Sequence, residues 1–409
     1  MGKYDYLIIG GGIAGVTAAE TIRENDPDST IGIISDEPYP LYSRVLLPHH
    51  LKKKISREKL FLRKIDDFSD KKIELRMNEE VSFLDCERKE VKLKGGAILG
   101  FNKLLVASGG RVKPWGKDGD QEFIYRLQTI DDADRLTEKL SSIKNSLVIG
   151  GSFISLEFLE IFTLNNIPST LLLRDTHFLS RIFDFRGGEI LRNNFEKYGI
   201  KMMAEDSVKE VEKKEGNLEI ETASLQKISC DSIALGIGID RNIEFLRDSG
   251  IELGERGIRT NQFLETNRAG IFAAGDTAEF FDIILGKHHV VGNWTNAFLQ
   301  GKIAGLNMLG RHEEFKKVSG YSITNLGFQI TALGECSSYH DSVIRLDAEK
   351  NQYERFCLQD GVLVGAALIN RFEDKPHLAN LIENKKNLEN YREQLADFKF
   401  DIQNISIVN

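Results

Sequence analysis

The sequence predicts an α/β protein with two βαβ units and a smaller α+β region at its carboxy-terminal end. Three observations support this prediction. An apolar strand, a glycine-rich turn and a helix open the chain, and the same pattern returns about 140 residues later. Beyond about residue 319 the pattern changes to short alternating strands with a hairpin-like turn.

Length and composition indicate a globular protein with more than one domain. The chain has 409 residues, of which 41% are hydrophobic and 28% charged. The formal net charge of −8 argues against a nucleic-acid partner, because phosphate binding needs an excess of Lys and Arg. No apolar run approaches the roughly 20 residues of a membrane span. The amino-terminal segment YDYLIIGGGIAGVTAAE could pass for a signal peptide, but its glycine spacing and acidic residues fit a buried strand, turn and helix better. We therefore expect a cytoplasmic protein with no membrane span.

The four cysteines predict neither a disulfide framework nor a metal site. Cys86, Cys230, Cys336 and Cys357 are far apart and form no CxxC pair. We expect them to be small apolar residues in a reducing compartment.

The first βαβ unit contains a strand at Tyr4–Ile9, a helix to about Glu24 and a strand at Thr30–Ser35. Its turn has the spacing Gly10-x-Gly12-x-x-Gly15. In this context the three glycines permit a tight turn, a close approach of backbone to a pyrophosphate, and helix packing against the strand.

The helix amino terminus of this unit offers N–H groups to the phosphate, and Asp36 or Glu37 at the end of the next strand can accept hydrogen bonds from a ribose. The unit therefore predicts a dinucleotide site of the Rossmann type.

The second βαβ unit has strands at Ser146–Ile149 and Ser169–Leu173, with a helix between them to about Leu164. Its turn departs from the usual spacing, since it reads Gly150-x-Ser152-x-x-Ser155. The Cβ of Ser152 stands where backbone should touch a pyrophosphate, although its hydroxyl offers a hydrogen bond instead. We expect nicotinamide binding here, and the alternative is that this turn has lost it.

The residue after the second strand bears on which nicotinamide binds. Arg174 follows Leu173, where a glutamate would hold both ribose hydroxyls. An arginine without that carboxylate favours a 2′-phosphate, and Asp175 weakens the preference. We predict NADPH ahead of NADH; the alternative is that Arg174 is a solvated surface charge.

Further strands are predicted between and after the two units, and a separate tail closes the chain. The tail has strands at Ser342–Leu346, Tyr353–Gln359 and Val362–Ile369, with QDG as a hairpin turn, and a charged helix from about Lys375 to Phe398. The other predicted strands are Lys72–Leu75, Val81–Asp85, Glu90–Leu93, Lys103–Ala107, Leu218–Thr222 and Ser232–Leu235.

The order of motifs along nearly the whole chain resembles a known family. A Rossmann opening, ASGG near residue 108, a second opening near residue 150, AAGD and then NWTNAFLQGKIAGLNMLG occur in this order. The same order is found in FAD-dependent pyridine nucleotide oxidoreductases of the glutathione reductase superfamily. Within it, DEPYPLYSRVLLP and GAALIN resemble NADH:rubredoxin oxidoreductases, ferredoxin reductases and the amino-terminal part of nitrite reductase large subunits.

This resemblance implies FAD and either NADPH or NADH as cofactors, and it implies residues that bind them. Asp36 would bind the FAD ribose, Arg44 the pyrophosphate, Val81 the adenine and Asp276 the ribityl chain. The remaining residues implied at the FAD site are Gly10, Gly12, Ile13, Ala14, Gly15, Glu37, Ala107, Ser108, Gly109, Gly275, Trp294, Asn296 and Ala297. Those implied at the NAD(P) site are Gly150, Ser152, Phe153, Ile154, Arg174 and Gly236.

Disulfide reductases of the superfamily have cysteine in the segment that here reads LYSRVLLP, where this chain has Tyr42 and Ser43. A hydroxyl cannot form a mixed disulfide, so electrons should leave the flavin directly. Ferredoxin reductases commonly have Lys where this chain has His49, paired with a glutamate that matches Glu157. A His49–Glu157 pair near the flavin is one interpretation, and a structural histidine is the other.

A basic run follows Arg44, and it could dock a small acidic electron carrier such as rubredoxin or ferredoxin. A solvated helix face explains it equally well. The resemblance also implies a possible homodimer formed through the tail. The run consists of Lys52, Lys53, Lys54, Arg57, Lys59, Arg63 and Lys64.

The resulting architecture has two Rossmann-like dinucleotide-binding domains, each a three-layer ββα arrangement, and a small α+β domain. We expect a discontinuous FAD domain at 1–112 and 242–320, an NAD(P) domain at 113–241, and an interface domain at 321–409. The expected function is FAD-dependent electron transfer from NAD(P)H to a carrier. The alternatives are a flavoprotein subunit of a larger complex, an NAD(P)H oxidase and a non-enzymatic flavin sensor.

Overall fold

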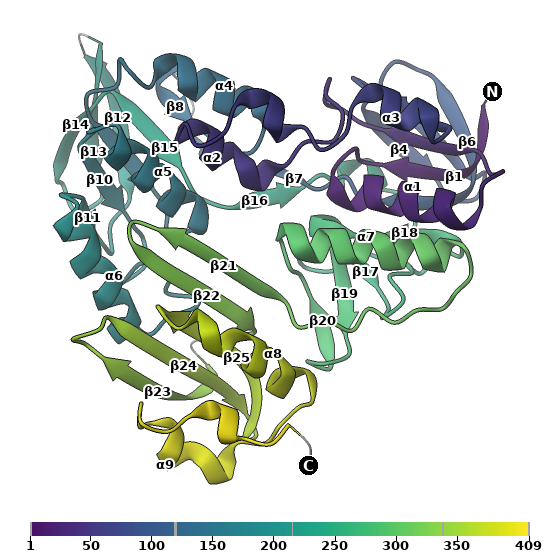
Figure 1. Ribbon diagram of the computed structural model, residues 1–409. Helices are drawn as coiled ribbons and strands as arrows, with labels where there is room; N and C mark the ends of the chain where they lie inside the picture. The colour runs from purple at the N-terminus through teal and green to yellow at the C-terminus, as the bar shows by residue number, and fades with distance from the viewer. Residues whose placement is uncertain (1, 118–120, 215, 338, 408–409) are drawn as a thin grey trace. The chain divides into compact units, whose positions relative to one another are not determined.

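The computed structural model describes residues 2–117, 121–214, 216–337 and 339–407. These residues form two compact units (Figure 1). Unit 1 comprises Met1–Leu46, Ile55–Arg111 and Ile239–Lys317, and unit 2 comprises Leu47–Lys54, Val112–Gly238 and Val318–Asn409. The short segment Leu47–Lys54 therefore folds with unit 2, although its neighbours on both sides belong to unit 1.

Unit 1 is built on a mixed sheet with the order β3-β2-β1-β6-β5-β4, and β18 also pairs with β6. β1, β2, β3, β6 and β18 are parallel where they pair, and β4 and β5 form an antiparallel extension. The strands are β1 (Lys3–Ile9), β2 (Ile31–Ile34), β3 (Ile73–Arg76), β4 (Val81–Asp85), β5 (Glu90–Leu93), β6 (Ile98–Val106) and β18 (Ile271–Ala273). The predicted strands in this region are confirmed.

Two helices of unit 1 pack closely against each other (Figure 1). They are α1 (Ile13–Asn25) and α7 (Trp294–Met308). A Cβ atom on Gly301 would lie 2.2 Å from the carbonyl oxygen of Ala14, so only glycine permits this approach. The contact brings the beginning of α1 beside a segment almost 300 residues further along the chain, which positions the first turn.

The remaining elements of unit 1 lie around this core. A small sheet has the order β17-β19-β20, and α3 packs on β3. The bounds are α3 (Ile65–Asp70), β7 (Gly110–Val112), β16 (Ile239–Arg241), β17 (Ile258–Thr260), β19 (Ala278–Asp282) and β20 (Lys287–His289). β7, whose last residue belongs to unit 2, pairs with β16.

Unit 2 contains the second parallel sheet, with the order β11-β10-β9-β15-β8. The helix α5 follows β9 and is apolar almost all round, as expected of a helix buried on several sides. The bounds are α2 (Leu47–Leu51), β8 (Ile124–Tyr125), α4 (Ile130–Lys139), β9 (Ser146–Ile149), α5 (Phe153–Leu164), β10 (Ser169–Leu172), α6 (Phe185–Lys197), β11 (Lys201–Met203), β12 (Val208–Lys214), β13 (Asn217–Thr222), β14 (Lys227–Cys230) and β15 (Ser232–Leu235). α2 packs against α4 and α5, which explains why it belongs to this unit.

The tail of the chain forms an antiparallel sheet with the order β21-β22-β25-β24-β23, on which α8 packs. Its elements are β21 (Gly320–Asn325), β22 (Phe328–Gly334), β23 (Asp341–Asp347), β24 (Gln352–Gln359), β25 (Val362–Ile369), α8 (Lys375–Glu383) and α9 (Arg392–Leu395). The QDG turn is confirmed, because Asp360 and Gly361 both have positive φ, as a two-residue hairpin requires.

Two predictions about this tail are wrong. The charged helix predicted over 375–398 ends at Glu383, where Lys385 turns the backbone to φ +51°, and resumes only as the short α9. The expectation of no disulfide is also wrong, because Cys336 and Cys357 are bonded, with their Cα atoms 5.6 Å apart. The two residues meet because the chain crosses over β25 after β22, and sequence spacing alone does not show it. Cys86 and Cys230 are free thiols.

No helix in the described ranges combines the length and apolarity that a membrane crossing requires. Within the same ranges, no cluster of three or more His, Cys, Asp or Glu side chains is arranged to hold a metal ion.

Candidate functional site

The turn between β1 and α1 is shaped so that backbone, and not side chains, faces outward. Gly10 has φ +120°, and a Cβ atom there would lie 2.1 Å from the carbonyl oxygen of Ala107. A Cβ atom on Gly15 would lie 2.0 Å from the carbonyl oxygen of Gly10. A Cβ atom on Gly12 would meet no atom within 4 Å among the described residues, its two chain neighbours aside. Gly12 is therefore a glycine that the protein's own packing does not require.

Gly12 is also the N-cap of α1, and as a glycine it brings no side chain to cap the first N–H groups. The first N–H groups of a helix carry a partial positive charge and need acceptors. Open space in front of uncapped N–H groups fits a phosphate, which supplies both the acceptor oxygens and the negative charge. The residues Ile13 and Ala14, which open the helix, belong to this cradle.

The end of β2 holds a network of charges. Asp36 is exposed and accepts a hydrogen bond from Arg111 Nη2 at 2.6 Å. Glu37 accepts from the hydroxyl of Tyr42 at 2.5 Å and is also paired with Arg44. Asp36 thus lies at the end of β2, where the sequence predicts the residue that binds a ribose. A bound ribose would share the Asp36 carboxylate with Arg111, a residue that the sequence did not indicate.

The 3-10 turn Gly275–Thr277 and the start of α7 lie beside the first turn. A Cβ atom on Gly275 would lie 3.3 Å from the Cβ of Ala14 and 3.6 Å from that of Ala297. Burial raises the pKa of Asp276, although the nearby Arg241 and Arg44 lower it. The structure therefore brings together the predicted residues of three distant segments.

A buried amide in α7 points to a further group at this place. Gln300 is fully buried, and its Oε1 accepts the N–H of Gly275 at 2.7 Å. Its Nε2 has no acceptor within the described ranges. Because an unpaired buried amide is costly, an acceptor from a bound molecule fits here.

Several other predicted residues of the FAD site have structural partners. Ser108 donates its hydroxyl to the carbonyl of Asn242 at 2.6 Å. The side chain of Asn296 donates to the carbonyl of Val291 at 3.1 Å. Trp294 packs against the hydrophobic core, and Val81 is buried in β4. Gly109 has φ +63°. Contacts of these residues with FAD stay a prediction.

The turn after β9 keeps the geometry of a phosphate turn in spite of its serines. Gly150 has φ +109°. Ser152 is the N-cap of α5, and its hydroxyl accepts the N–H of Ser155 at 3.3 Å. A Cβ atom on Gly236 would lie 1.9 Å from the Ser155 hydroxyl oxygen and 2.7 Å from that of Ser152. Glycine at 236 therefore makes the room that both serines need, which the spacing of the turn alone did not show.

The loop after β10 presents the nicotinamide-specificity candidates. Arg174 and Asp175 are exposed, as is Arg181 further along the loop. Arg174 has no protein partner in the part of the chain that the structure describes. At the start of α5, Phe153 contacts Tyr321 with ring centroids 4.3 Å apart and the ring planes inclined at 47°, and Ile154 is exposed.

A buried cluster in unit 2 replaces the predicted His49–Glu157 pair. Lys52, whose side chain is 3% exposed, is paired with Glu157 and with Glu160, one turn apart on α5. Asn325 Nδ2 donates to Glu157 at 3.3 Å and to Glu160 at 3.1 Å. The cation is therefore three residues beyond the position that the resemblance indicates.

Opposing electrostatic effects act on the pKa values of Glu157 and of the neighbouring His49. Burial raises the pKa of Glu157, Lys52 lowers it, and the second carboxylate of Glu160 raises it again. Burial and the nearby Lys52 lower the pKa of His49, so this ring favours its neutral form. Sequence reasoning missed the roles of Lys52 and Glu160 in this cluster. The available signal was a pair of acids, Glu157 and Glu160, three residues apart in an otherwise apolar helix.

The basic run does not form one helix face. Lys52 is buried in the cluster, and Arg63 is paired with Glu20 at 2.8 Å. Arg57 lies over the rings of Tyr39 and Phe61. Lys53, Lys54, Lys59 and Lys64 are the exposed members.

Comparison with known proteins gives two family matches. The profile of the pyridine nucleotide-disulphide oxidoreductases matches residues 4–301, and that of the rubredoxin NAD+ reductase C-terminal domain matches residues 301–386. Apoptosis-inducing factor 3 of Mus musculus is 30% identical over 369 residues, which cover 89% of this chain and 60% of that protein. The chain thus spans 60% of the length of this relative.

Two further proteins match over almost their whole length. NADH-rubredoxin oxidoreductase of Clostridium acetobutylicum is 26% identical over 385 residues, which cover 94% of this chain and 96% of that protein. The crystal structure of a ferredoxin reductase from Rhodopseudomonas palustris has a TM-score of 0.90 and 23% identity, and the match covers 98% of this chain and 99% of that one. The predicted fold class is confirmed.

Proposed function

Because the chain belongs to the pyridine nucleotide-disulphide oxidoreductase family, we propose that it is an FAD-dependent NAD(P)H oxidoreductase that passes electrons to a small carrier protein. The observation that carries this proposal is the pair of phosphate turns. Each begins with a glycine of positive φ, Gly10 or Gly150, and each leads into a helix. One turn alone would fit many nucleotide-binding proteins, whereas two fit a protein that handles two dinucleotides.

FAD fits unit 1. Gly12 and the first N–H groups of α1 would hold its pyrophosphate, Asp36 its ribose, and Asp276 and the amide of Gln300 further polar groups. Flavin supplies the exchange between a two-electron hydride donor and one-electron acceptors. The protein's contribution is to bind and orient, and no side-chain nucleophile is needed. We assign FAD to residues 1–112 and 242–320, NAD(P) to 113–241, and an interface role to 321–409.

Electrons leave without a thiol in the segment where disulfide reductases place one. Tyr42 and Ser43 occupy that segment, and both are buried. The hydroxyl of Tyr42 is committed to Glu37, so this segment serves the charge network at β2. Transfer straight to an acceptor is the remaining route.

A small acidic carrier such as rubredoxin or ferredoxin is the proposed acceptor. The named relatives include an NADH-rubredoxin oxidoreductase, and the tail matches the rubredoxin NAD+ reductase C-terminal domain. The exposed Lys53 and Lys54 offer positive charge to such a partner. We place the protein in the cytoplasm, because NAD(P)H is an intracellular electron donor.

The cluster of Lys52, Glu157 and Glu160 is proposed to hold a proton within the nicotinamide-binding unit. Three observations support it: burial, two carboxylates facing one ammonium, and the raised pKa of Glu157. Such a group can take up and return a proton without forming a covalent bond.

Replacing Arg174 with glutamine is expected to weaken NADPH use while leaving NADH use unchanged. The free guanidinium would bind the 2′-phosphate that only NADPH carries, and losing a charge-assisted contact costs about 2 kcal/mol, or about thirtyfold in KM. Steady-state reduction of a small dye with each donor measures this change. Lys197→Gln, which removes an exposed charge elsewhere in unit 2, is the control. An equal rise in KM for both donors would show that Arg174 does not read the 2′-phosphate.

A further inference from the structure

The disulfide of the tail lies beside the loop that follows β10, and the electron-transfer proposal makes no use of it. It joins Cys336, just after β22, to Cys357 in β24. Cys357 is fully buried, whereas Cys336 is half-buried. Cys336 is therefore the more accessible of the two residues to a molecule arriving from solvent.

The bond fastens a segment that crosses the sheet. β25 lies between β22 and β24, so the chain must pass over β25 to bring Cys336 to Cys357. It does so at Gly365, where a Cβ atom would lie 2.2 Å from the carbonyl oxygen of Glu335. Gly365 is paired with Gly334 on one side and with Cys357 on the other. The disulfide thus closes a crossing that only a glycine at 365 permits.

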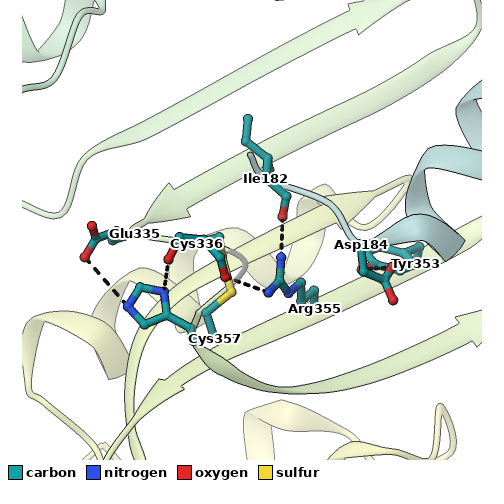
Figure 2. Close-up of a disulfide and its surroundings, with 9 residues drawn as sticks. Ile182, Asp184, Glu335, Cys336, Tyr353, Arg355 and Cys357 are labelled. Carbon is teal, nitrogen blue, oxygen red and sulfur yellow. Dashed lines mark hydrogen bonds and ion pairs between the residues drawn. A yellow bond between two sulfur atoms is a disulfide. The ribbon is translucent and has the colours of Figure 1, made fainter. Parts of the chain in front are cut away.

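One guanidinium ties this crossing to the loop after β10. Arg355 is 4% exposed, and its Nη2 donates to the carbonyl of Ser337 at 2.8 Å. Its Nη1 donates to the carbonyl of Ile182 at 3.1 Å (Figure 2). Ser337 is next to Cys336, and Ile182 is in the loop that carries Arg174.

Strand β24, which carries Arg355, also supports the end of that loop. The hydroxyl of Tyr353 donates to Asp184 Oδ1 at 2.8 Å (Figure 2), and Asp184 is the N-cap of α6. Tyr353, Arg355 and Cys357 alternate along β24 and so lie on one face of the strand. The loop and the disulfide therefore share one support.

We propose that Cys336–Cys357 is a reversible thiol–disulfide exchange site for a small thiol, and that its redox state sets the order of the loop at residues 174–184 and hence the affinity for the pyridine nucleotide. The nucleotide part of this proposal rests on the proposed function of that loop. The exchange itself and its effect on loop order stand on the contacts of Arg355, Tyr353 and the crossing at Gly365.

The exchange proceeds in two balanced steps. A thiolate attacks the sulfur of Cys336 and forms a mixed disulfide, while the bond to Cys357 breaks and Cys357 leaves as a thiolate that takes up a proton. A second thiolate attacks the sulfur of the first small thiol, and Cys336 leaves in the same way. Two small thiols are oxidised to one disulfide, and the two cysteines receive their two electrons and two protons.

Reduction acts on the loop through Arg355. Once the bond is broken, the segment 335–337 is no longer fastened to β24, and Arg355 loses its fixed acceptor at Ser337. A buried guanidinium with a lost acceptor reorients toward others, which frees Ile182 and loosens the loop. Arg181, next to Ile182 and exposed, reports this loosening as a trypsin site.

The test compares the full-length protein before and after reduction with a phosphine. Alkylation of the unfolded protein is expected to count two thiols before and four after, since Cys86 and Cys230 are already free. Trypsin cleavage after Arg181 is expected to be at least about fivefold faster in the reduced protein, and the calorimetric Kd for NADP+ at least about threefold weaker.

Three variants sharpen the result. Cys336→Ala/Cys357→Ala is expected to behave as the reduced protein under both conditions, Arg355→Met to show fast cleavage under both, and Cys86→Ser to respond as the wild type does. Equal cleavage and equal Kd in the two redox forms, with the thiol count changed from two to four, overturn the proposal. If NADP+ and NAD+ bind to neither form, the nucleotide part falls together with the proposed function of the loop, and the cleavage rates show whether the redox control of loop order survives.

Discussion

Replacing Gly12 with valine is expected to weaken FAD binding strongly and leave the polypeptide folded. The Cβ of the new side chain would meet no atom within 4 Å among the described residues other than its chain neighbours, so we expect the packing of unit 1 to be undisturbed. It would fill the space in front of the uncapped N–H groups of α1, where the pyrophosphate is proposed to lie. We expect the affinity for FAD to fall by at least about 100-fold, or about 2.8 kcal/mol.

Flavin content of the purified variant and its FAD titration measure the affinity, and urea unfolding of the FAD-free proteins measures the fold. Gly95→Val is the matched control, because its Cβ would also meet no protein atom within 4 Å but lies far along the chain from the turn. Gly15→Val gives the contrast: its Cβ would lie 2.0 Å from the Gly10 carbonyl oxygen, so it should lower the stability itself. A Gly12→Val protein with its normal yellow flavin would show that the cofactor does not lie at this turn.

Replacing Lys52 with methionine is expected to lower the free energy of unfolding by about 3–5 kcal/mol, the usual result of removing one partner from a buried ion pair. The substitution leaves Glu157 and Glu160 facing each other without the ammonium that both now contact. Lys53→Met, which removes the adjacent exposed charge, should change the stability by no more than about 0.5 kcal/mol.

The stability lost in Lys52→Met should grow as the pH rises. Glu157 has a raised pKa in the folded protein, chiefly because it is buried, and removal of Lys52 raises the pKa further. A carboxyl whose folded pKa lies above its unfolded pKa contributes stability that is present below the unfolded pKa and lost as pH rises through the folded pKa. Denaturant unfolding at pH 5 and pH 8 tests this, and the gap between Lys52→Met and wild type should be wider at pH 8. A gap that narrows, or a Lys52→Met/Glu160→Gln protein no more stable than Lys52→Met, would contradict this account of the cluster.

The local pattern of the sequence predicts the two βαβ units because neighbouring residues determine the strand, the turn and the helix of each unit. Strand, glycine turn and helix follow one another within about 30 residues, and the positive φ of Gly10 and Gly150 is what such turns require. The hairpin at Asp360 and Gly361 is equally local. The long tail helix fails for the opposite reason, since contacts with a distant hairpin hold 384–391 out of a helix. Lys385 has φ +51°, Asn387 forms a β-bridge with Val362, and the N–H of Leu388 donates to the carbonyl of Gly361 at 2.7 Å.

The parts of the site that sequence reasoning missed depend on pairs far apart in the chain. Lys52 meets Glu157 across 105 residues because α2 folds with unit 2, and Arg111 meets Asp36 across 75. Gly236 makes room for Ser152 and Ser155, so the altered turn becomes intelligible only when β15 is placed beside β9. The disulfide likewise depends on sheet order, which no spacing of cysteines reveals.

The most direct test of the central claim is an anaerobic titration of the purified yellow protein with NADPH and, separately, with NADH, following the flavin absorption band. An FAD-dependent NAD(P)H oxidoreductase should bleach rapidly with about one equivalent of the preferred donor per flavin, and added rubredoxin or ferredoxin should restore the colour. A flavin that dithionite bleaches but neither nucleotide reduces would contradict the claim.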